Sequence, residues 1–152
     1  MLVEPGAALW LDVLLPAGDP LWIPDVGRAF LWLGEAWRDA LVALGVPARV
    51  HEGGLCSTPW SRLVCFGGLG TGEVVDTDGV KLVGLSQRRT RAGARFQCMA
   101  MAAWDPAAIV SLLDLSPKDR AEATAGLTAV TRAVPVPLDE LRSEVLTQLL
   151  SK

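Results

Sequence analysis

Residues 61–104 limit the fold of this chain more than any other stretch, because their pattern predicts short strands joined by turns. Within them, residues 73–75 and 80–85 are expected to pair as a hairpin. The connection at residues 76–79 contains Asp78-Gly79, which is a strong turn signal between two apolar segments. We therefore expect a sheet built from neighbouring segments at the centre of the fold.

Two more strands extend this expected sheet on either side of the hairpin. Residues 62–66 are expected to begin it, and residues 94–103 are expected to form a strand that alternates between two faces. One face of that strand carries Phe96, Cys98, Ala100 and Ala102. Together with the hairpin, these segments predict a mostly antiparallel or mixed sheet.

The segments outside this sheet predict two strands and several helices. Residues 7–15 read as a buried strand, and a helix is expected from Pro24 to Gly45. Residues 48–51 are expected to add a short strand. The apolar residues at helical spacing in the first helix are Val26, Phe30, Leu33, Trp37, Leu41 and Leu44. Three more helices are expected to begin at Asp105-Pro106, at Ser116-Pro117 and at Pro137. The order predicts an α+β fold with helices packed on the sheet.

Composition excludes several classes of protein. The chain has 152 residues, of which 51% are hydrophobic and 20% charged, and this suits one globular domain. A net charge of −3 without a basic run argues against nucleic acid as a partner. No segment is apolar over a length that would cross a bilayer, and Glu4 stands where a secretory leader would carry a cation. Three cysteines, an odd number, favour reduced thiols and a cytoplasmic location.

Lys81 is the most unusual residue of the predicted sheet. It is the one charge in the apolar run of residues 80–84, where a buried ammonium is costly unless a partner or a function uses it. Such a lysine can hold a carbonyl or phosphate oxygen and stabilise the negative charge that develops during acyl transfer. The alternative is a hairpin lysine just after Gly79 whose ammonium lies in water.

The sequence GVKLVGLSQRR, with Asp78-Gly79 before it and Cys65-Phe66 upstream, resembles the central motif of the lipoate–protein ligase and octanoyltransferase superfamily. The resemblance runs from residues 3–6 to about Trp104. It implies a biotin/lipoate protein ligase-like (class II synthetase-like) domain. The implied function is attachment of lipoate or octanoate to a lysine of a lipoyl carrier domain. A biotin ligase-like domain is the weaker alternative, because the Ser86-Gln87-Arg88 ending is more lipoate-like.

The same resemblance implies the site residues. Lys81 matches the lysine that contacts the acyl carbonyl and, in ATP-using members, the adenylate. Residues 67–72 form a glycine-rich loop beside the acyl site or a simple connection, since their spacing fits neither a Walker nor a dinucleotide-binding loop. The expected substrate-binding residues are Gly70, Gly72, Val83, Gly84, Ser86, Gln87 and Arg88.

Cys65 supplies the second chemistry that the resemblance implies. Some octanoyltransferases of the superfamily pass the acyl group through a cysteine thioester without ATP, and their cysteine lies in a Cys-Phe step ahead of the lysine. A thiolate near an ammonium is a good nucleophile, whereas most free cysteines are small buried residues. Cys98 is expected in the core and Cys56 in a loop. His51, the only histidine, has no catalytic or metal-ligand set around it in the sequence.

The resemblance also implies cofactors and partners. ATP with Mg²⁺ belongs to the ligase version, and lipoate or octanoate is the substrate, with no metal bound by the protein itself. The implied partners are lipoyl domains of 2-oxoacid dehydrogenase E2 or the glycine cleavage H protein, and acyl carrier protein as a donor.

A second motif of the superfamily, Arg-Arg-x-x-Gly-Gly-Gly-x-Val, is absent. Met1 stands directly after the place where it is expected. We therefore expect a single, incomplete catalytic domain over residues 1–152, truncated at the N-terminus by a start codon assigned to a GTG valine. An in-frame run of codons for this motif upstream would support that, and a nearby stop codon would exclude it. The alternative is an inactive remnant that binds acyl chains or carrier domains.

Overall fold

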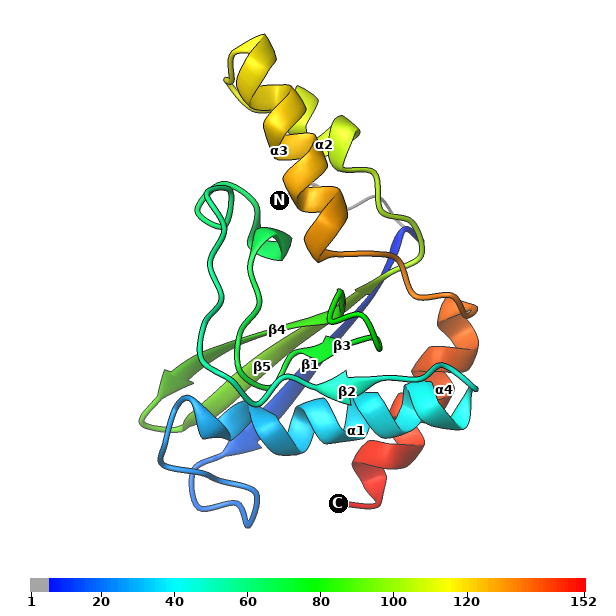
Figure 1. Cartoon of the computed structure of the whole chain (residues 1–152). Helices are drawn as coiled ribbons and strands as arrows, with labels where there is room; N and C mark the ends of the chain where they lie inside the picture. The colour runs from blue at the N-terminus through cyan, green and yellow to red at the C-terminus, as the bar shows by residue number, and fades with distance from the viewer. Residues whose placement is uncertain (1–5) are drawn as a thin grey trace.

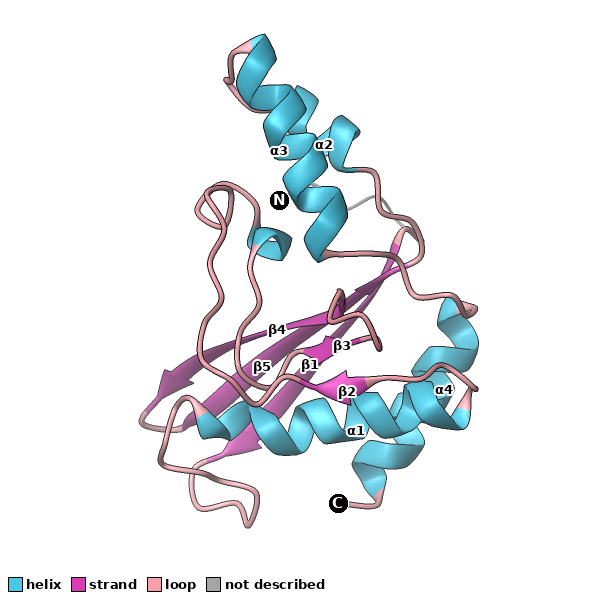
Figure 2. Ribbon diagram, viewed as in Figure 1, coloured by secondary structure: helices cyan, strands magenta, loops and turns pink. Residues whose placement is uncertain are grey.

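The computed structural model describes residues 6–152, which form a sheet with helices packed against it (Figures 1 and 2). The helices are α1 (Leu31–Ala43), α2 (Pro106–Ser111), α3 (Pro117–Val130) and α4 (Leu138–Leu150), with short 3₁₀ turns η1 (Arg28–Phe30) and η2 (Cys65–Gly67). The strands are β1 (Ala8–Pro16), β2 (Arg49–Val50), β3 (Val74–Val75), β4 (Lys81–Thr90) and β5 (Gly93–Met101). The α+β prediction is confirmed.

The five strands lie in the order β1-β5-β4-β3-β2, and each neighbouring pair is antiparallel. The sheet is therefore antiparallel rather than mixed, apart from one isolated parallel bridge between Lys81 and Thr131. The hairpin prediction is confirmed, because Asp76 Oδ1 accepts hydrogen bonds from the backbone of Asp78 and Val80, and Gly79 adopts a φ of 83°. The start of the sequence resemblance at residues 3–5, and the question of truncation at Met1, lie outside the described residues.

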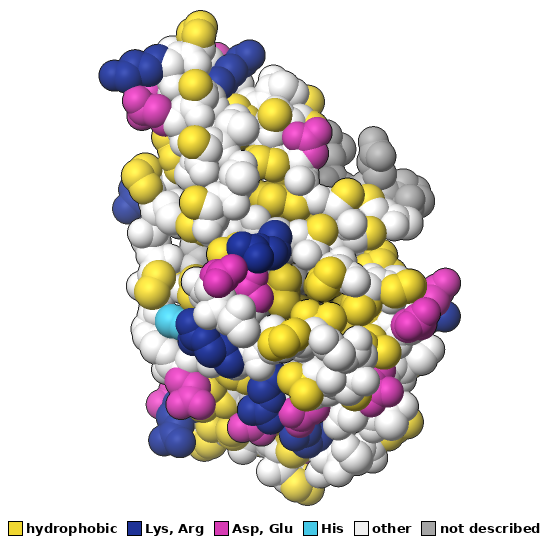
Figure 3. Space-filling model, turned by 45° about the vertical axis from the view of Figure 1, so that its right-hand side comes forward, with side chains coloured by type: hydrophobic (Ala, Val, Ile, Leu, Met, Phe, Trp, Pro, Cys, Tyr) yellow, Lys and Arg dark blue, Asp and Glu magenta, His cyan; other side chains and the backbone are white. Residues whose placement is uncertain are grey.

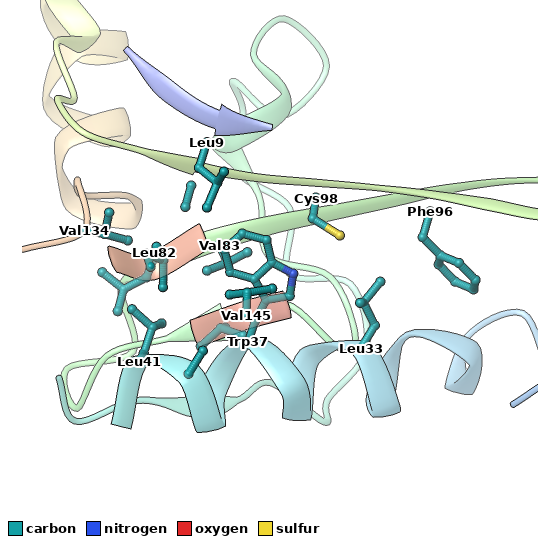
Figure 4. Packing of buried hydrophobic residues seen from close by; sticks show 14 of the residues in the cluster. Leu9, Leu33, Trp37, Leu41, Leu82, Val83, Phe96, Cys98, Val134 and Val145 are labelled. Carbon is teal, nitrogen blue, oxygen red and sulfur yellow. The ribbon is translucent and has the colours of Figure 1, made fainter. Parts of the chain in front are cut away.

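The main core lies between the sheet and the helices α1 and α4, which cover the same face (Figure 1). Alternate residues of β5 supply one side of this core, and Figure 4 shows Phe96 and Cys98 pointing toward α1. Trp37 of α1 is fully buried against them, as its helical spacing predicted. The prediction that Cys98 belongs to the core is confirmed as well.

A smaller core lies under α2 and α3, which extend beyond one end of the sheet (Figure 2). Val64 from the segment before η2 packs there against Val110, Ala123 and Leu127. Both helices begin as predicted, because Asp105 accepts a hydrogen bond from the Ala108 backbone and Ser116 accepts one from Asp119. This second core fixes the position of η2 over the sheet.

The predicted strand at residues 62–66 is wrong. These residues form turns that end in η2, because hydroxyl groups bind the local backbone in place of a strand partner. Thr58 Oγ1 and Ser61 Oγ both donate to the Gly67 carbonyl, at 2.6 and 2.9 Å. The backbone of Leu63 donates to the Trp60 carbonyl within the same turn.

The predicted start of the first helix at Pro24 is also wrong. Asp25 Oδ1 accepts hydrogen bonds from the backbone of Gly27 and Arg28 at 2.8 and 3.1 Å, which makes Asp25 the effective capping residue. The chain then passes through η1, and the α-helix starts only at Leu31.

Charged side chains of both signs are interspersed on the face in Figure 3. Two of the arginines in residues 88–95 have partners that are distant in the sequence. Arg89 donates to the Ile23 and Pro24 carbonyls and lies over the Trp22 ring, and Arg95 forms an ion pair with Asp12 at 2.6 Å. Over residues 6–152, no helix combines the length and the apolar character needed to span a membrane.

Candidate functional site

The register of β4 and β5 places the predicted substrate-binding residues of β4 on two opposite faces of the sheet. Gly84, Ser86 and Arg88 pair with Met99, Gln97 and Arg95, which lie on the face opposite to α1 and α4. We call this the outer face of the sheet. Val83 belongs to the main core on the other face. Gln87 pairs with the core residue Phe96 and donates to the Val26 carbonyl, so it holds a surface loop.

A bulge in β4 brings Lys81 to the outer face. Val83 pairs with Val74, whereas Lys81 pairs with Val75, so Leu82 is the extra residue of β4 at this point. The Phe66 ring then contacts both positions. The Lys81 ammonium lies 5.0 Å from the ring centroid, and a Cβ at Gly84 would lie 2.8 Å from Phe66 Cζ. Lys81, Gly84 and the Cys65-Phe66 step therefore meet in space.

Lys81 is buried and paired with a carboxylate. Its Nζ lies 2.9 Å from Oε2 of Glu73, and the two side chains are only 1% and 9% exposed. The alternative of a solvated hairpin lysine is therefore wrong. An ammonium kept away from water in this way is a fixed positive charge, and within residues 6–152 its anionic partner is Glu73.

Glu73 is itself held by the backbone. Its Oε2 accepts a hydrogen bond from Gly70 N at 2.7 Å, and its Oε1 accepts one from Leu85 N at 3.1 Å. Glu73 thus connects the glycine-rich loop, the lysine and the middle of β4. Three charge-assisted contacts to one buried carboxylate make this arrangement rigid.

The segment after α3 makes hydrogen bonds to the backbone of Lys81 and of Phe66. The backbone N–H of Arg132 donates to the Lys81 carbonyl at 3.0 Å, and Thr131 Oγ1 donates to the Phe66 carbonyl at 2.8 Å. Thr131 is almost fully buried. These contacts fix both the lysine backbone and the turn that carries Phe66.

The glycines of the loop at residues 67–72 have structural reasons to be glycine. Gly72 has a φ of +86°, and a Cβ there would collide with Phe30 at the start of α1. The opposing Gly34 in α1 leaves room for the Gly72 carbonyl. The N–H of Gly70 is engaged by Glu73. The loop therefore packs against α1 and supports the lysine.

The three cysteines lie in different environments, and all are free thiols. Cys65 is exposed at the start of η2, directly before Phe66. Cys98 is buried in the core, and burial raises the pKa of its thiol to about 12. Cys56 is exposed, and its Sγ lies 4.0 Å from His51 Nε2, a proximity that the sequence did not predict.

Sequence reasoning missed Glu73, Phe66 and Thr131 as neighbours of Lys81. A signal for Glu73 was present, because an acidic residue lies across the predicted hairpin from the lone lysine of an apolar strand. Thr131 had no such signal, since its contact with the lysine strand depends on how α3 packs. Within residues 6–152, no three His, Cys, Asp or Glu side chains gather as a metal site.

Solved structures with the same fold include lipoate-protein ligases. A bipartite lipoate protein ligase of Thermoplasma acidophilum, described together with its E2 lipoyl domain, superposes with a TM-score of 0.72 at 17% identity, covering 95% of this chain and 51% of the ligase. Lipoate-protein ligase A bound with ATP gives 0.62 at 20% identity, with coverage of 95% and 51%. Protein Ta0514 of T. acidophilum with bound lipoic acid gives 0.58 at 17%, with the same coverage.

The chain therefore has the lipoate-protein ligase fold, and it spans about half the length of these structures. No protein-family model and no curated protein matches the sequence. The expected fold class is confirmed, while the roles of the individual site residues stay predictions.

Proposed function

We propose that this chain carries out part or all of the attachment of lipoate or octanoate to a lysine of a lipoyl carrier domain, with Lys81 at the reacting centre. The observation that carries the proposal is the position of Lys81. It is a buried ammonium beside the glycine-rich loop, on the outer face with Gly84, Ser86 and Arg88, in a fold shared with lipoate ligases. A fixed cation in such a site stabilises the oxygen of an acyl group while charge develops on it.

In the ligase route, Lys81 holds the acyl group during two displacements. The lipoate carboxylate first attacks the α-phosphorus of ATP and releases pyrophosphate. The carrier lysine amine then attacks the acyl carbonyl and releases AMP. ATP is a substrate in this scheme. Lys81 is the cation that suits its phosphate oxygens, and the described residues offer no acidic cluster for Mg²⁺, which would be carried by the phosphates. The neighbours that bind ATP and lipoic acid support these ligands.

A substrate can reach Lys81 only if the Phe66 side chain moves. The Phe66 ring lies over the ammonium and over Gly84, so an acyl chain reaches both only when this ring turns away. Phe66 belongs to a short 3₁₀ turn between two loops, which needs less rearrangement than a displaced strand. Ser86 and Arg88 on the outer face then line the route beyond Gly84.

The proposed acceptor is a lipoyl carrier domain, because the first of the matched ligases is described with its E2 lipoyl domain. The glycine cleavage H protein is a second proposed acceptor, and acyl carrier protein is a proposed donor of octanoate. Free thiols at all three cysteines fit a cytoplasmic location.

Cys65 supports a second candidate function, octanoyl transfer without ATP. Its side chain is exposed, and its neighbour Phe66 contacts Lys81. The Cys65 thiolate would attack an octanoyl thioester, displace the donor thiol, and pass the acyl group to the carrier lysine. The ammonium of Lys81 would stabilise the tetrahedral oxyanion in both steps.

The test is the intact mass of a lipoyl carrier domain after incubation with this protein, with lipoate, octanoate and octanoyl-carrier protein present, with and without ATP. Transfer that requires ATP supports the ligase, and transfer without ATP that Cys65→Ser abolishes supports the transferase. Lys81→Met should remove either activity, whereas the surface variant Lys118→Met should keep it. No modification under any condition would refute catalysis by this chain and leave the inactive remnant.

A further inference from the structure

Glu73 has no role in the sequence-based description of the site, yet it makes more polar contacts around Lys81 than any other described side chain. Its carboxylate joins Lys81 Nζ, Gly70 N and Leu85 N, at 2.9, 2.7 and 3.1 Å. These three groups belong to three different parts of the site. The lysine begins β4, Gly70 lies in the glycine-rich loop, and Leu85 follows Gly84, which the Phe66 ring covers.

We infer that Glu73 is a positioning residue, which fixes the ammonium of Lys81 and the glycine-rich loop in the geometry needed for acyl transfer. This inference rests on the proposed function. Glu73 acts through Lys81 and does not touch the acyl group. An ammonium has three N–H donors and the pair with Glu73 needs one, so Lys81 can also donate to a substrate oxygen once the Phe66 ring has moved.

The alternative is that Glu73 pairs with Lys81 only until an anionic substrate displaces the Glu73 carboxylate. The backbone contacts argue against this. Two N–H groups from separate segments hold the carboxylate, and displacing it would leave both without this acceptor in a partly buried site. Within residues 6–152, the Lys81 ammonium has one ion pair, with Glu73, besides its contact with the Phe66 ring. The carboxylate is therefore the fixed partner, and the lysine depends on it.

The three lysines of the chain allow a direct test. Lys81, Lys118 and Lys152 have side chains 1%, 83% and 24% exposed, so reductive methylation followed by peptide mass spectrometry reports each one separately. In the wild-type chain Lys81 should react far more slowly than Lys118. Glu73→Gln should raise the Lys81 rate by roughly tenfold or more, because the anchor of the ammonium and of the loop is lost.

Two further variants separate positioning from unfolding. Glu73→Asp keeps the charge but is one methylene shorter, so it cannot reach all three partners and should give an intermediate Lys81 rate. Glu122→Gln removes the carboxylate of an exposed pair with Lys118 and should leave the Lys81 rate at the wild-type value. Rates are compared only in samples whose circular dichroism is native.

The second readout is kinetic. In folded Glu73→Gln we expect a kcat for transfer lower by about 10- to 100-fold and a higher KM for the acyl donor, with the KM for the carrier domain unchanged. A Glu73 that only stabilised the fold would lower the melting temperature and leave the Lys81 rate and the donor KM unchanged. That result, or tighter binding of the donor by Glu73→Gln, would overturn the inference.

The two proposals fail in different ways. If the wild-type chain transfers no acyl group, the proposed function fails, and the labelling of Lys81 still decides whether Glu73 positions it. If the wild-type chain is active but Lys81 labelling in Glu73→Gln equals that of the wild type, the inference about Glu73 fails and the proposed function stands.

Discussion

Gly84 and Phe66 are complementary in shape, since the aromatic ring fills the space that any larger residue on β4 would need. A Cβ at Gly84 would lie 2.8 Å from Cζ and 3.1 Å from Cε2 of Phe66. The ring is buried and also contacts Trp104, at 6.0 Å between centroids. The contact with Phe66 is a packing reason for glycine at position 84 that needs no bound ligand. It also places the ring that covers Lys81 directly against β4.

Gly84→Ala should therefore destabilise the protein by about 1–3 kcal/mol, because the ring must move within a packed site. Urea denaturation followed by tryptophan fluorescence measures this change. Adding Phe66→Leu to Gly84→Ala should recover part of the loss, because the smaller side chain leaves room for the methyl group. Gly54→Ala, where a Cβ has no neighbour within 4 Å, is the control and should change stability by less than about 0.5 kcal/mol. Equal losses for Gly84→Ala and Gly54→Ala would contradict the packing argument.

Gly34→Ala should be destabilising although alanine is the better helix former. In an exposed helix this substitution gains up to about 1 kcal/mol. Here the new Cβ would collide with the Gly72 carbonyl, which is backbone and cannot rotate away, so we expect a loss of about 2 kcal/mol or more.

Gly126→Ala in α3 is the matched comparison. Its Cβ would lie 3.1 Å from Cδ1 of Trp60, a side chain that can shift, so the helix gain and the crowding should nearly cancel. Thermal unfolding of the two variants ranks them, and a Gly34→Ala protein more stable than wild type would show that α1 moves away from the loop.

The sequence predicted the elements with strong local signals. The hairpin around Asp78-Gly79, the helices capped by Asp105 and Ser116, and the burial of Trp37 all depend on neighbouring residues, and each is present. The segment at residues 62–66 failed because its apolar pattern also suits a turn that packs on α3, and only the hydroxyls of Thr58 and Ser61 indicate the turn.

The site was predictable in part for a similar reason. Lys81 stood out because a charge in an apolar strand is rare, and its burial supports that reasoning. The bulge at Leu82, which turns Lys81 toward Phe66, depends on the pairing of β3 with β4 and leaves no clear mark in the sequence. The contacts of Thr131 with Phe66 and Lys81 depend on the path of the chain after α3, which no local pattern specifies.

Removing one partner of the Lys81–Glu73 pair should cost more than removing both. Lys81→Met alone leaves a buried carboxylate without its cation, and we expect a loss of about 3–5 kcal/mol. The double variant Glu73→Leu with Lys81→Met should be closer to wild type, although the N–H groups of Gly70 and Leu85 then lose their acceptor. Lys118→Met, at an exposed pair, should change stability by less than about 1 kcal/mol. Urea denaturation of the wild type, Lys81→Met, Glu73→Leu and the double variant measures the coupling energy of the pair, and additive losses would contradict a direct interaction.

The buried thiol of Cys98 should make stability fall at alkaline pH. Burial raises the pKa of Cys98 to about 12 from the ordinary 9.0, so below pH 9 the thiol is protonated in both states and contributes no pH dependence. Above pH 9 the unfolded chain loses this proton while the folded chain keeps it, and the stability decreases until the pH passes the folded pKa. One such group lowers the free energy of unfolding by about 1.4 kcal/mol per pH unit in this range.

Cys98→Ala isolates this contribution, because all other titrating groups are shared. The difference in unfolding free energy between wild type and Cys98→Ala, measured in urea at pH 8 and pH 10, should shrink by about 1.4 kcal/mol at the higher pH. Labelling with a thiol reagent at pH 8 should modify the exposed Cys56 and Cys65 and leave Cys98 unreacted until the chain unfolds. A difference that stays constant between the two pH values would mean that water reaches the sulfur in the folded protein, and that the packing of β5 against Trp37 is looser than its burial indicates.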